Sequence, residues 1–283
     1  MEMDKQKNLG QGDVIVSLCN VISSNGKQLK KVSERAWQSI TLTESMGLIH
    51  GDTQFVSGEI TILDSTNIMN EMNLVGDEVI ELKFKTPQKG EINFTGKVYN
   101  VSVSDFDRAR ALTLKYCSTE KLVSDQLKIN AVYRDMPYSE IAKKIFAPLN
   151  VLGKKKIYAE PTKNKGNIVA NNKSPIDVIN QLGKAAVSEN YQGASYVFFE
   201  QIEPPAVLST GNRSPSGGMF QFVSLEKLID PSENKPTMLY YYDAPPENQG
   251  SVESLVRIKS YKVLNMPNLA TGIRGGMFGS MAI

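Results

Sequence analysis

The chain has 283 residues, of which 41% are hydrophobic and 22% charged, and its formal net charge is +2. This length and composition allow a sizeable buried core and are typical of soluble globular proteins. The nearly balanced charge argues against a strongly basic surface for nucleic acid and against a strong field for an acidic substrate.

Residues 13–119 have a β pattern. Apolar and polar residues alternate, as antiparallel strands with one solvated face require. The clearest runs are residues 14–18, 39–43, 58–63, 79–84, 91–103 and 109–116. The range 65–72 predicts a short helix with its cap among residues 64–66. Six or seven short strands in about a hundred residues predict a first antiparallel β-barrel domain over 13–119.

Helical patterns follow residue 119. In the range 137–149 the apolar residues recur every four positions, which indicates an amphipathic helix. The range 174–189 predicts a second helix, with Ser174 as N-cap and Pro175 at the first helical position. Its apolar face should pack on a buried strand at residues 195–201. These elements predict an α+β middle domain over residues 120–202.

A loop rich in Pro, Gly, Ser and Thr covers residues 203–218 and is expected to be exposed. Beyond it, strands are predicted at residues 220–223 and 238–242, with a further stretch at 252–263. The end of the sequence, residues 265–283, is rich in Gly and Met and has no closing strand. We expect residues 203–283 to form part of a second β domain.

Residues with catalytic or metal-binding chemistry are sparse. His50 is the only histidine and lies in a segment that predicts an exposed turn. Cys19 and Cys117 lie far from it in sequence, so no zinc-binding pattern forms. We expect both cysteines to be buried free thiols, although a disulfide between them stays open. The glycine-rich segment 272–276 follows no strand–helix framework and is a weak candidate for phosphate binding.

Acidic pairs offer a second candidate chemistry, that of a glycosidase. Asp77 with Glu78, and Glu200 with Glu203, could in principle supply its two carboxyl groups. Such pairs arise by chance in a chain with 30 acidic residues. We therefore predict no catalytic, cofactor-binding or metal-binding residues, no cofactor, and no enzyme activity.

Two further clusters of side chains have simpler explanations. The lysines at 154–156, with Lys163 and Lys165, are expected in a solvated loop, because no aromatic residues interleave with them as in a single-strand binder. Tyr240 and Tyr242 would share one face of a strand and could form a sugar-binding platform, but a core or interface role is favoured.

The order of the β segments resembles the first tube domain of the baseplate hub proteins of contractile-tailed phages of the T-even type. The resemblance lies in the "Asp-Ser-x-Asn" turn at residues 64–67 and in the "Gly-(Asp/Asn)-Glu-x-Ile" strand at residues 76–80. Further matching segments are residues 40–44, 58–63, 98–103, 174–176, 196–200 and 218–228. The resemblance covers residues 14–283 and implies two tube-type barrels around the α+β middle domain.

The resemblance implies a mechanical function. Hub proteins of this family form a homotrimer whose two barrels per subunit give a ring with pseudo-sixfold symmetry. Such a ring joins the central spike protein to tail tube or tube-initiator proteins, contacts baseplate wedge proteins, and surrounds the channel through which DNA passes without specific binding. The expected location is the virion tail, assembled in the host cytoplasm.

One departure from the family concerns the second barrel. The family has several further strands after the segment that corresponds here to Gly276–Ser280, so we expect an incomplete second barrel. The first 12 residues lack the apolar stretch of a signal peptide, and no run approaches a membrane span, so no membrane anchor is expected. Two alternatives remain open: a tail-associated cell-wall hydrolase and a carbohydrate-binding adhesion module.

Overall fold

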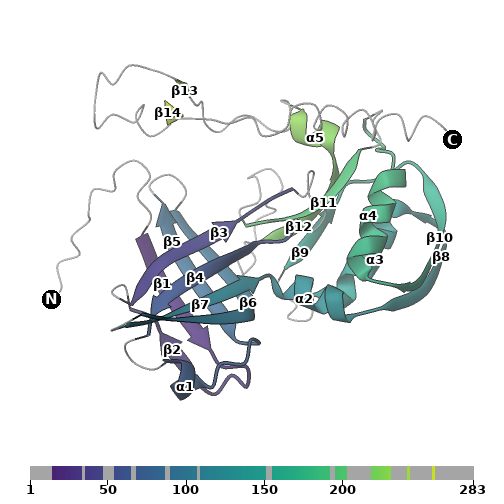
Figure 1. The fold of residues 1–283 in the computed structure, drawn as a ribbon. Helices are drawn as coiled ribbons and strands as arrows, with labels where there is room; N and C mark the ends of the chain where they lie inside the picture. Colours follow the sequence, from purple (N-terminus) through teal and green to yellow (C-terminus); the bar gives the residue numbers. More distant parts are fainter. Residues whose placement is uncertain are drawn as a thin grey trace.

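The computed structural model describes residues 15–33, 36–46, 54–64, 68–86, 90–106, 109–150, 155–191, 195–202, 218–230, 241–242 and 257–258. Most of them form two units that lie side by side (Figure 1). One is a curled antiparallel sheet and the other contains helices between two small sheets. The predicted α+β, strand-dominated fold class is confirmed.

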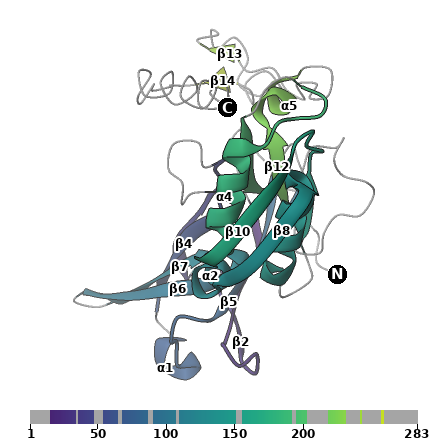
Figure 2. The ribbon, with the colours of Figure 1, turned by 90° about the vertical axis from the view of Figure 1, so that its right-hand side faces the viewer.

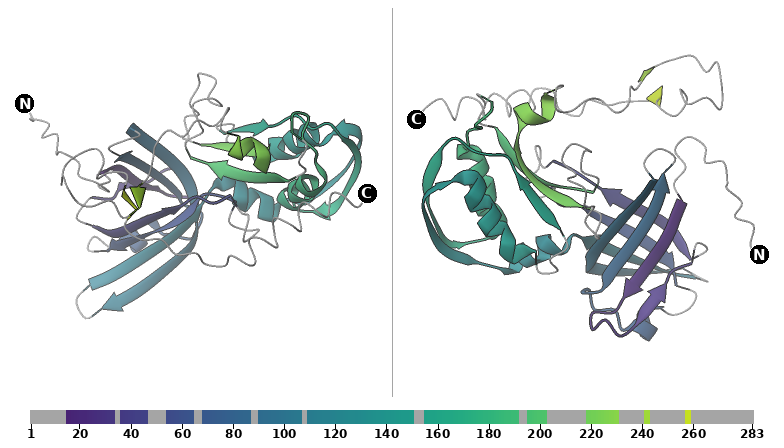
Figure 3. Two further views of the ribbon diagram at one scale, coloured as in Figure 1. Left: turned by 90° about the horizontal axis from the view of Figure 1, so that it is seen from above. Right: turned by 180° about the vertical axis from the view of Figure 1, so that it is seen from behind.

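The first unit is a seven-stranded sheet that curls around its core without closing (Figure 3). In sheet order its strands are β2 (Leu29–Lys31), β1 (Ile15–Ile22), β5 (Val79–Thr86), β6 (Gly90–Phe106), β7 (Ala109–Cys117), β4 (Ser57–Leu63) and β3 (Trp37–Thr43). All neighbouring strands are antiparallel. Within the described part of the chain, β2 and β3 have no second neighbour. The unit is therefore a half-barrel with two open edges.

Alternation along the strands places the apolar side chains inside the half-barrel. Its largest fully buried members are Tyr116, Ile60, Ile62, Ile80, Leu82, Leu112 and Leu114. The hydroxyl of Tyr116 donates a 2.6 Å hydrogen bond to the carbonyl oxygen of Thr41, which satisfies the one polar atom of this ring. A Cβ at Gly58 would clash with the same carbonyl oxygen, so only glycine fits at this position.

The short helix α1 (Ile68–Met72) begins where Asp64 accepts hydrogen bonds from the backbone. The Asp64 carboxylate lies 2.5 Å from the amide nitrogen of Ile68 and 3.4 Å from that of Met69. A carboxylate at this position satisfies amide groups that have no partner within the helix. The left-handed conformation of Asn73, at φ 48°, ends the helix.

The hairpin of β6 and β7 is longer than the rest of the sheet. β6 pairs with β5 up to Lys97, and beyond Val98 only β7 lies beside it. Figure 2 shows this part of the hairpin projecting from the half-barrel. Residues 100–106 of β6 thus have one unpaired edge among the described elements.

The second unit follows directly from β7. Its elements are α2 (Thr119–Gln126), β8 (Ile129–Pro137), α3 (Tyr138–Phe146), a 3-10 turn η1 (Ala147–Leu149), β9 (Lys156–Ala159), β10 (Lys165–Lys173), α4 (Pro175–Ala185), β11 (Tyr196–Gln201), β12 (Met219–Ser224) and α5 (Leu225–Ile229). β8 and β10 form an antiparallel ribbon, and β11, β12 and β9 form a three-stranded sheet. Helices α3 and α4 contact both sheets and lie between them (Figure 1).

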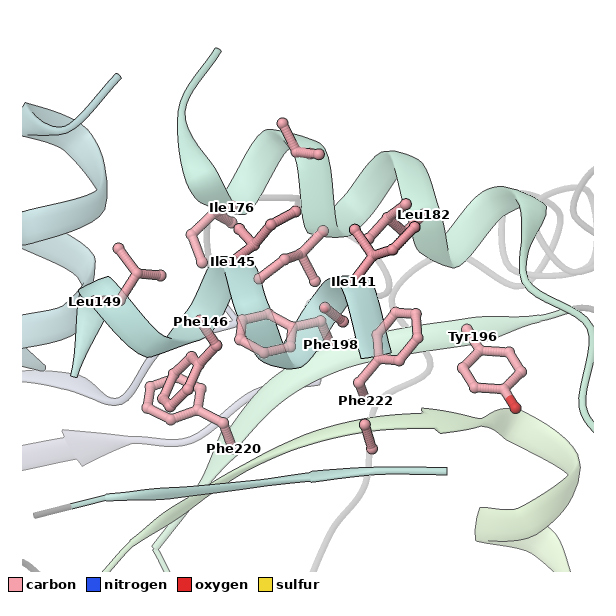
Figure 4. Packing of buried hydrophobic residues seen from close by; sticks show 14 of the residues in the cluster. Ile141, Ile145, Phe146, Leu149, Ile176, Leu182, Tyr196, Phe198, Phe220 and Phe222 are labelled. Carbon is pink, nitrogen blue, oxygen red and sulfur yellow. The ribbon is translucent and has the colours of Figure 1, made fainter. Parts of the chain in front are cut away.

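The core of this α+β unit lies where the two helices meet the three-stranded sheet (Figure 4). The rings of Phe198 and Phe220 stack with their centroids 5.4 Å apart. Leu182 of α4 is completely buried in the same cluster. The prediction that this helix packs on the strand at 195–201 is confirmed.

Helix α4 begins as predicted but ends earlier. Ser174 caps it by accepting a 3.2 Å hydrogen bond from the amide of Asp177. The helix ends at Ala185 because the next residues bond to other segments. The amide of Val187 donates to the side chain of Asn164, and Ser188 pairs with Thr162.

The strand at residues 219–224 was predicted to belong to the second β domain, over residues 203–283, but it lies in the α+β unit. β12 pairs antiparallel with β11 and parallel with β9, so it is the central strand of the α+β unit. Five of its six residues are buried, as is typical of a strand with neighbours on both edges. Of the predicted second barrel, only β13 (Tyr241–Tyr242) and β14 (Arg257–Ile258), which pair in parallel, are also described. The rest of that barrel lies outside the described residues.

Candidate functional site

The contact between the two units is built from four segments that are distant in sequence. They are residues 54–56 before β4, the corner between β7 and α2, Lys155 before β9, and the end of β11. We call this region the joint. Because β7 runs straight into α2, the chain itself holds two of the segments close together.

A buried charge cluster lies at the centre of the joint. The Lys155 Nζ atom is 2.9 Å from Oε2 of Glu120 and 2.5 Å from Oε1 of Glu200. The side chains of Lys155, Glu120 and Glu200 are only 4%, 3% and 2% exposed. Two carboxylates therefore share one ammonium group inside the protein.

Glu200 also bonds to the half-barrel through its second carboxylate oxygen. This oxygen accepts a 3.0 Å hydrogen bond from the amide of Val56 and another from the hydroxyl of Ser118. The Glu200 amide in turn donates to the carbonyl of Gln54 over 2.8 Å. A single residue of β11 thus fixes both the start of β4 and the end of β7.

Burial and charge act in opposite directions on the acid–base chemistry of the cluster. Burial raises the pKa of Glu120 above its ordinary 4.5, because desolvation of the carboxylate outweighs the attraction of Lys155. Burial by itself would lower the pKa of Lys155, but the charges of Glu200 and Glu120 raise it above 10.5. The ammonium group therefore stays charged at neutral pH.

The hydrophobic cores interlock around this cluster. Phe55, from the segment before β4, packs edge-on against Phe198 and Phe220 in the core of the α+β unit. Conversely, Ile202, just after β11, packs against the core of the half-barrel. The Lys155 ammonium lies 5.5 Å from the centre of the Phe220 ring. Each unit thus completes the core of the other.

This arrangement suits mechanical coupling rather than bond chemistry. The acceptor oxygens of Glu200 are already bonded to an ammonium group, an amide and a hydroxyl, and the side chain is almost completely buried. A buried pair adds little net stability, but separating its members leaves an uncompensated charge and is strongly destabilising. The cluster therefore penalises any rotation of one unit against the other.

The acidic residues considered for glycosidase chemistry make other contacts where they are described. The Asp77 carboxylate lies 2.6 Å from the Lys97 ammonium. The buried Glu78 side chain accepts from the amides of Val75 and Gly76, so it holds the turn before β5. Glu200 is joined instead to Glu120, and its predicted partner Glu203 lies outside the described residues.

The expectation of a solvated lysine loop is wrong for Lys155. Its side chain is buried, whereas its neighbour Lys156 is exposed and Lys154 lies outside the described residues. The physical reason is the pair of acidic partners, which lie 35 and 45 positions away in the sequence. Because the attraction is entirely long-range, no local pattern could have revealed it.

The two cysteines are buried and unbridged, as favoured from the sequence. Burial raises the pKa of each thiol to about 12. Across the described ranges, no group of three or more His, Cys, Asp or Glu residues is placed to hold a metal ion. No helix there is both long and apolar enough to span a membrane.

The remaining candidates lie beyond what the structure describes. His50, Tyr240 and the glycine-rich segment 272–276 are outside the described residues. For Tyr242 only the backbone pairing in β13 is described. The structure therefore leaves the sugar-platform and phosphate-loop interpretations as they were.

The chain was compared with protein families, curated proteins and solved structures. No protein-family model and no curated protein matches the chain. Three similar solved structures illustrate the likeness. The 43 kDa tail protein of prophage MuSo2 from Shewanella oneidensis has a TM-score of 0.45 and 10% identity, over 73% of this chain and 54% of that one. The prophage tail protein gp18 from Listeria monocytogenes EGD-e has a TM-score of 0.46 and 10% identity, over 81% and 56%.

The third is the E. coli c3393 protein, a type VI secretion component similar to the T4 tail proteins gp27 and gp5. Its TM-score is 0.40 and its identity 7%, over 74% of this chain and 48% of that one. The chain spans about half the length of these three structures. These three similar structures are two phage tail proteins and a type VI secretion component.

Proposed function

We propose that the chain is a structural component of a phage tail baseplate hub and acts as a homotrimer. Three subunits, each with one tube-type domain over residues 13–119 and part of a second one in the sequence after α5, would give a ring with pseudo-sixfold symmetry around a DNA channel. The observation that carries this proposal is the half-barrel, a curled sheet with open edges that is fixed rigidly to an α+β unit.

Open edges are the reason to expect assembly. β3 ends the sheet on one side, and on the other β2 covers only residues 20–22 of β1. Unpaired backbone groups along an edge pair readily with another strand, so isolated proteins usually protect them. Here the edges are not closed into a barrel, and a ring of subunits would cover them.

The joint supports the same function. A ring that connects a spike to a tail tube transmits force through each subunit, and a subunit with a loose hinge would deform. The charge cluster of Lys155, Glu120 and Glu200 opposes such rotation. In this proposal the spike, the tube or tube-initiator proteins and the wedge proteins bind the ring from outside, and DNA passes without specific contacts.

The test is the stoichiometry of the complex with the spike. The protein and the spike protein of the same phage are mixed and examined by mass photometry and negative-stain imaging. We expect three copies per spike trimer and a ring with a central channel. One copy per spike trimer, or a two-fold assembly, would contradict the proposal.

A strand-edge variant tests how the ring closes. Val103 lies in the part of β6 with one unpaired edge and is 37% exposed. Val103→Lys places a charge beside that edge, which disfavours pairing with another strand. We expect weaker trimer formation, whereas Val75→Lys, a change at a more exposed valine (66%) outside the strands, leaves assembly unchanged.

We also propose that the protein is not an enzyme. The acidic residues considered for hydrolysis hold the joint and a turn, as described above. Incubation with peptidoglycan should release no soluble fragments. Turnover that disappears on Glu200→Gln, in a variant that stays folded, would instead support a cell-wall hydrolase.

A further inference from the structure

The ribbon formed by β8 and β10 has an inner face that packs on the core and an outer face that carries exposed apolar and polar residues. The inner face of the ribbon packs on the core of the α+β unit through Ile129, Tyr133 and Ile168. The outer face points away from the molecule (Figure 2). Alternation places seven residues on this outer face: Asn130, Val132, Arg134, Lys165, Asn167, Val169 and Asn171.

Two valines stand at the centre of this face. Val132 and Val169 are direct cross-strand partners, and they are 56% and 65% exposed. Directly opposed side chains in an antiparallel pair have Cβ atoms about 5 Å apart, so the two form one aliphatic patch. Single exposed apolar residues are common. Two directly opposed valines, with polar residues around them on the same face, form a small apolar surface that a binding partner would cover.

The asparagines around the patch are fixed as hydrogen-bond donors. The Oδ1 atom of Asn130 accepts from the amide of Asn172 over 2.8 Å, and that of Asn167 accepts from the amide of Asp135 over 3.1 Å. A backbone amide can only donate, so these contacts assign the side-chain oxygens. The NH2 groups of Asn130 and Asn167 are thereby left for an outside acceptor.

The same contacts make the ribbon rigid. Asn172 and Asp135 have left-handed backbones, with φ of 51° and 49°, at the two irregularities in the pairing of β8 with β10. Each is held by one of the two asparagines. The donor groups therefore stand on a preorganised surface, which lowers the entropy lost when a partner binds.

The charges of the face point to the same chemistry. Arg134 lies in the same row as Val132, and the exposed Lys128 stands just before the start of β8; neither makes an ion pair with a described residue. The seven outward residues include no carboxylate, and the nearby Asp135 is 3.8 Å from Lys165. The face thus offers cations and amide donors around an aliphatic centre.

We infer that this outer face binds an acidic protein segment that places aliphatic side chains on Val132 and Val169 and carboxylates on the surrounding donors. Carboxylates accept from ammonium, guanidinium and amide groups, and the last two donate in a plane that suits them. The valine pair supplies the contact that a purely ionic surface lacks. The inference does not depend on the proposed function in a tail.

The experiment uses three immobilised ten-residue peptides and the full chain in solution. The peptides alternate Glu with Val, Glu with Ser, and Lys with Val. We expect the Glu/Val peptide to bind at least about tenfold more tightly than either of the others, with affinity that falls as salt rises. Comparable binding to all three peptides, or none to the Glu/Val peptide, would overturn the inference.

Two variants and two controls assign the binding to this face. Val132→Ser with Val169→Ser, and Lys128→Glu with Arg134→Glu, should each weaken Glu/Val binding about tenfold or more. Val75→Ser and Lys115→Glu change exposed residues of the half-barrel and should leave it unchanged. Equal losses in the controls would refute the assignment. Tighter binding to a DNA duplex or to anionic lipid vesicles, abolished by the same ribbon variants, would also refute it.

Discussion

At Lys155 a single ammonium group balances two carboxylates that are hidden from water. Removing this ammonium group therefore destabilises the protein mainly because it leaves two buried carboxylates without a cation. Lys155→Met keeps most of the side-chain volume but leaves Glu120 and Glu200 buried without a cation. We expect the free energy of unfolding to fall by about 3–5 kcal/mol, measured by urea denaturation.

Two comparisons make this prediction specific. Lys156→Met changes the exposed neighbour and should cost less than about 0.5 kcal/mol. Adding Glu120→Gln and Glu200→Gln to Lys155→Met removes the buried charges and should recover part of the loss. If Lys155→Met is as stable as the wild type, the charge cluster does not hold the joint.

The raised pKa of Lys155 gives this contribution a pH dependence. A basic group whose folded pKa exceeds its unfolded value stabilises the protein below the unfolded pKa, here 10.5, and loses this effect as pH rises through the folded pKa. The stability difference between wild type and Lys155→Met should therefore narrow as the pH rises above 10.5. Denaturation at several pH values measures it, and a constant difference would contradict the assignment.

The pKa of Glu120 is also raised, so its contribution to stability has the same sign of pH dependence, but at lower pH. Its raised pKa means that the folded state favours the proton, so its favourable contribution exists below 4.5 and is lost as pH rises through the folded pKa. Lys155 partly offsets this cost by attracting the carboxylate. The residues next to Glu120 and Lys155 in the sequence do not indicate that the two side chains pair. For this reason the sequence did not predict the joint.

Among the elements, α4 shows what local sequence can determine. Its N-cap, its first-turn proline and the spacing of its apolar residues are all local features, and each was found in the structure. Its end was misplaced because Asn164 and Thr162, which bond to the residues after Ala185, belong to another segment. Local patterns thus predict where this helix starts, and tertiary bonds decide where it stops.

Other elements were missed because their patterns are mixed. In β8 the inner row includes Ala131 and the outer row includes Val132, so alternation does not separate apolar from polar residues. In α2 the buried residues are Thr119, Glu120 and Ser124, which leaves no apolar stripe. The strands of the half-barrel, which have one buried and one solvated face, were recognised more readily.

Leu182 tests the packing of α4 on the three-stranded sheet. It is completely buried against the aromatic side chains of β11 and β12 (Figure 4). Leu182→Ala leaves a cavity that rigid aromatic neighbours cannot fill, and should reduce the free energy of unfolding by about 2–5 kcal/mol. Gln181→Ala, at the exposed residue just before Leu182 in the same helix, provides the control. A cost for Leu182→Ala below about 1 kcal/mol would show that this side chain is not part of the core.

At the scale of the whole molecule, the exchange of Phe55 and Ile202 between the two cores predicts cooperative unfolding. Loss of either unit exposes a gap in the other, so calorimetry should show the half-barrel and the α+β unit melting in one transition. Phe55→Ala should separate this transition into two. Phe84→Ala, in the half-barrel core, should lower the melting temperature and keep a single transition. Two transitions in the wild type would contradict this coupling.

The resemblance in sequence predicted the class of the molecule because it lies in the order of many elements. It did not show that the first sheet is open, since closure depends on whether β2 and β3 meet. Nor did it place β12, whose partners β9 and β11 lie on either side of it in the sheet. These features depend on contacts between distant segments, which no single motif encodes.

The way Phe55 crosses the joint has a consequence for recombination between related genes. A chimera that exchanges only the segment after β7 would keep its own Gln54–Val56 segment. In that chimera, this segment would face a residue from the other protein in place of Glu200. A functional exchange of the α+β unit must therefore also include the short segment before β4. Exchanges that carry this segment along should yield folded hybrids, whereas a cut placed at residue 119 alone should not.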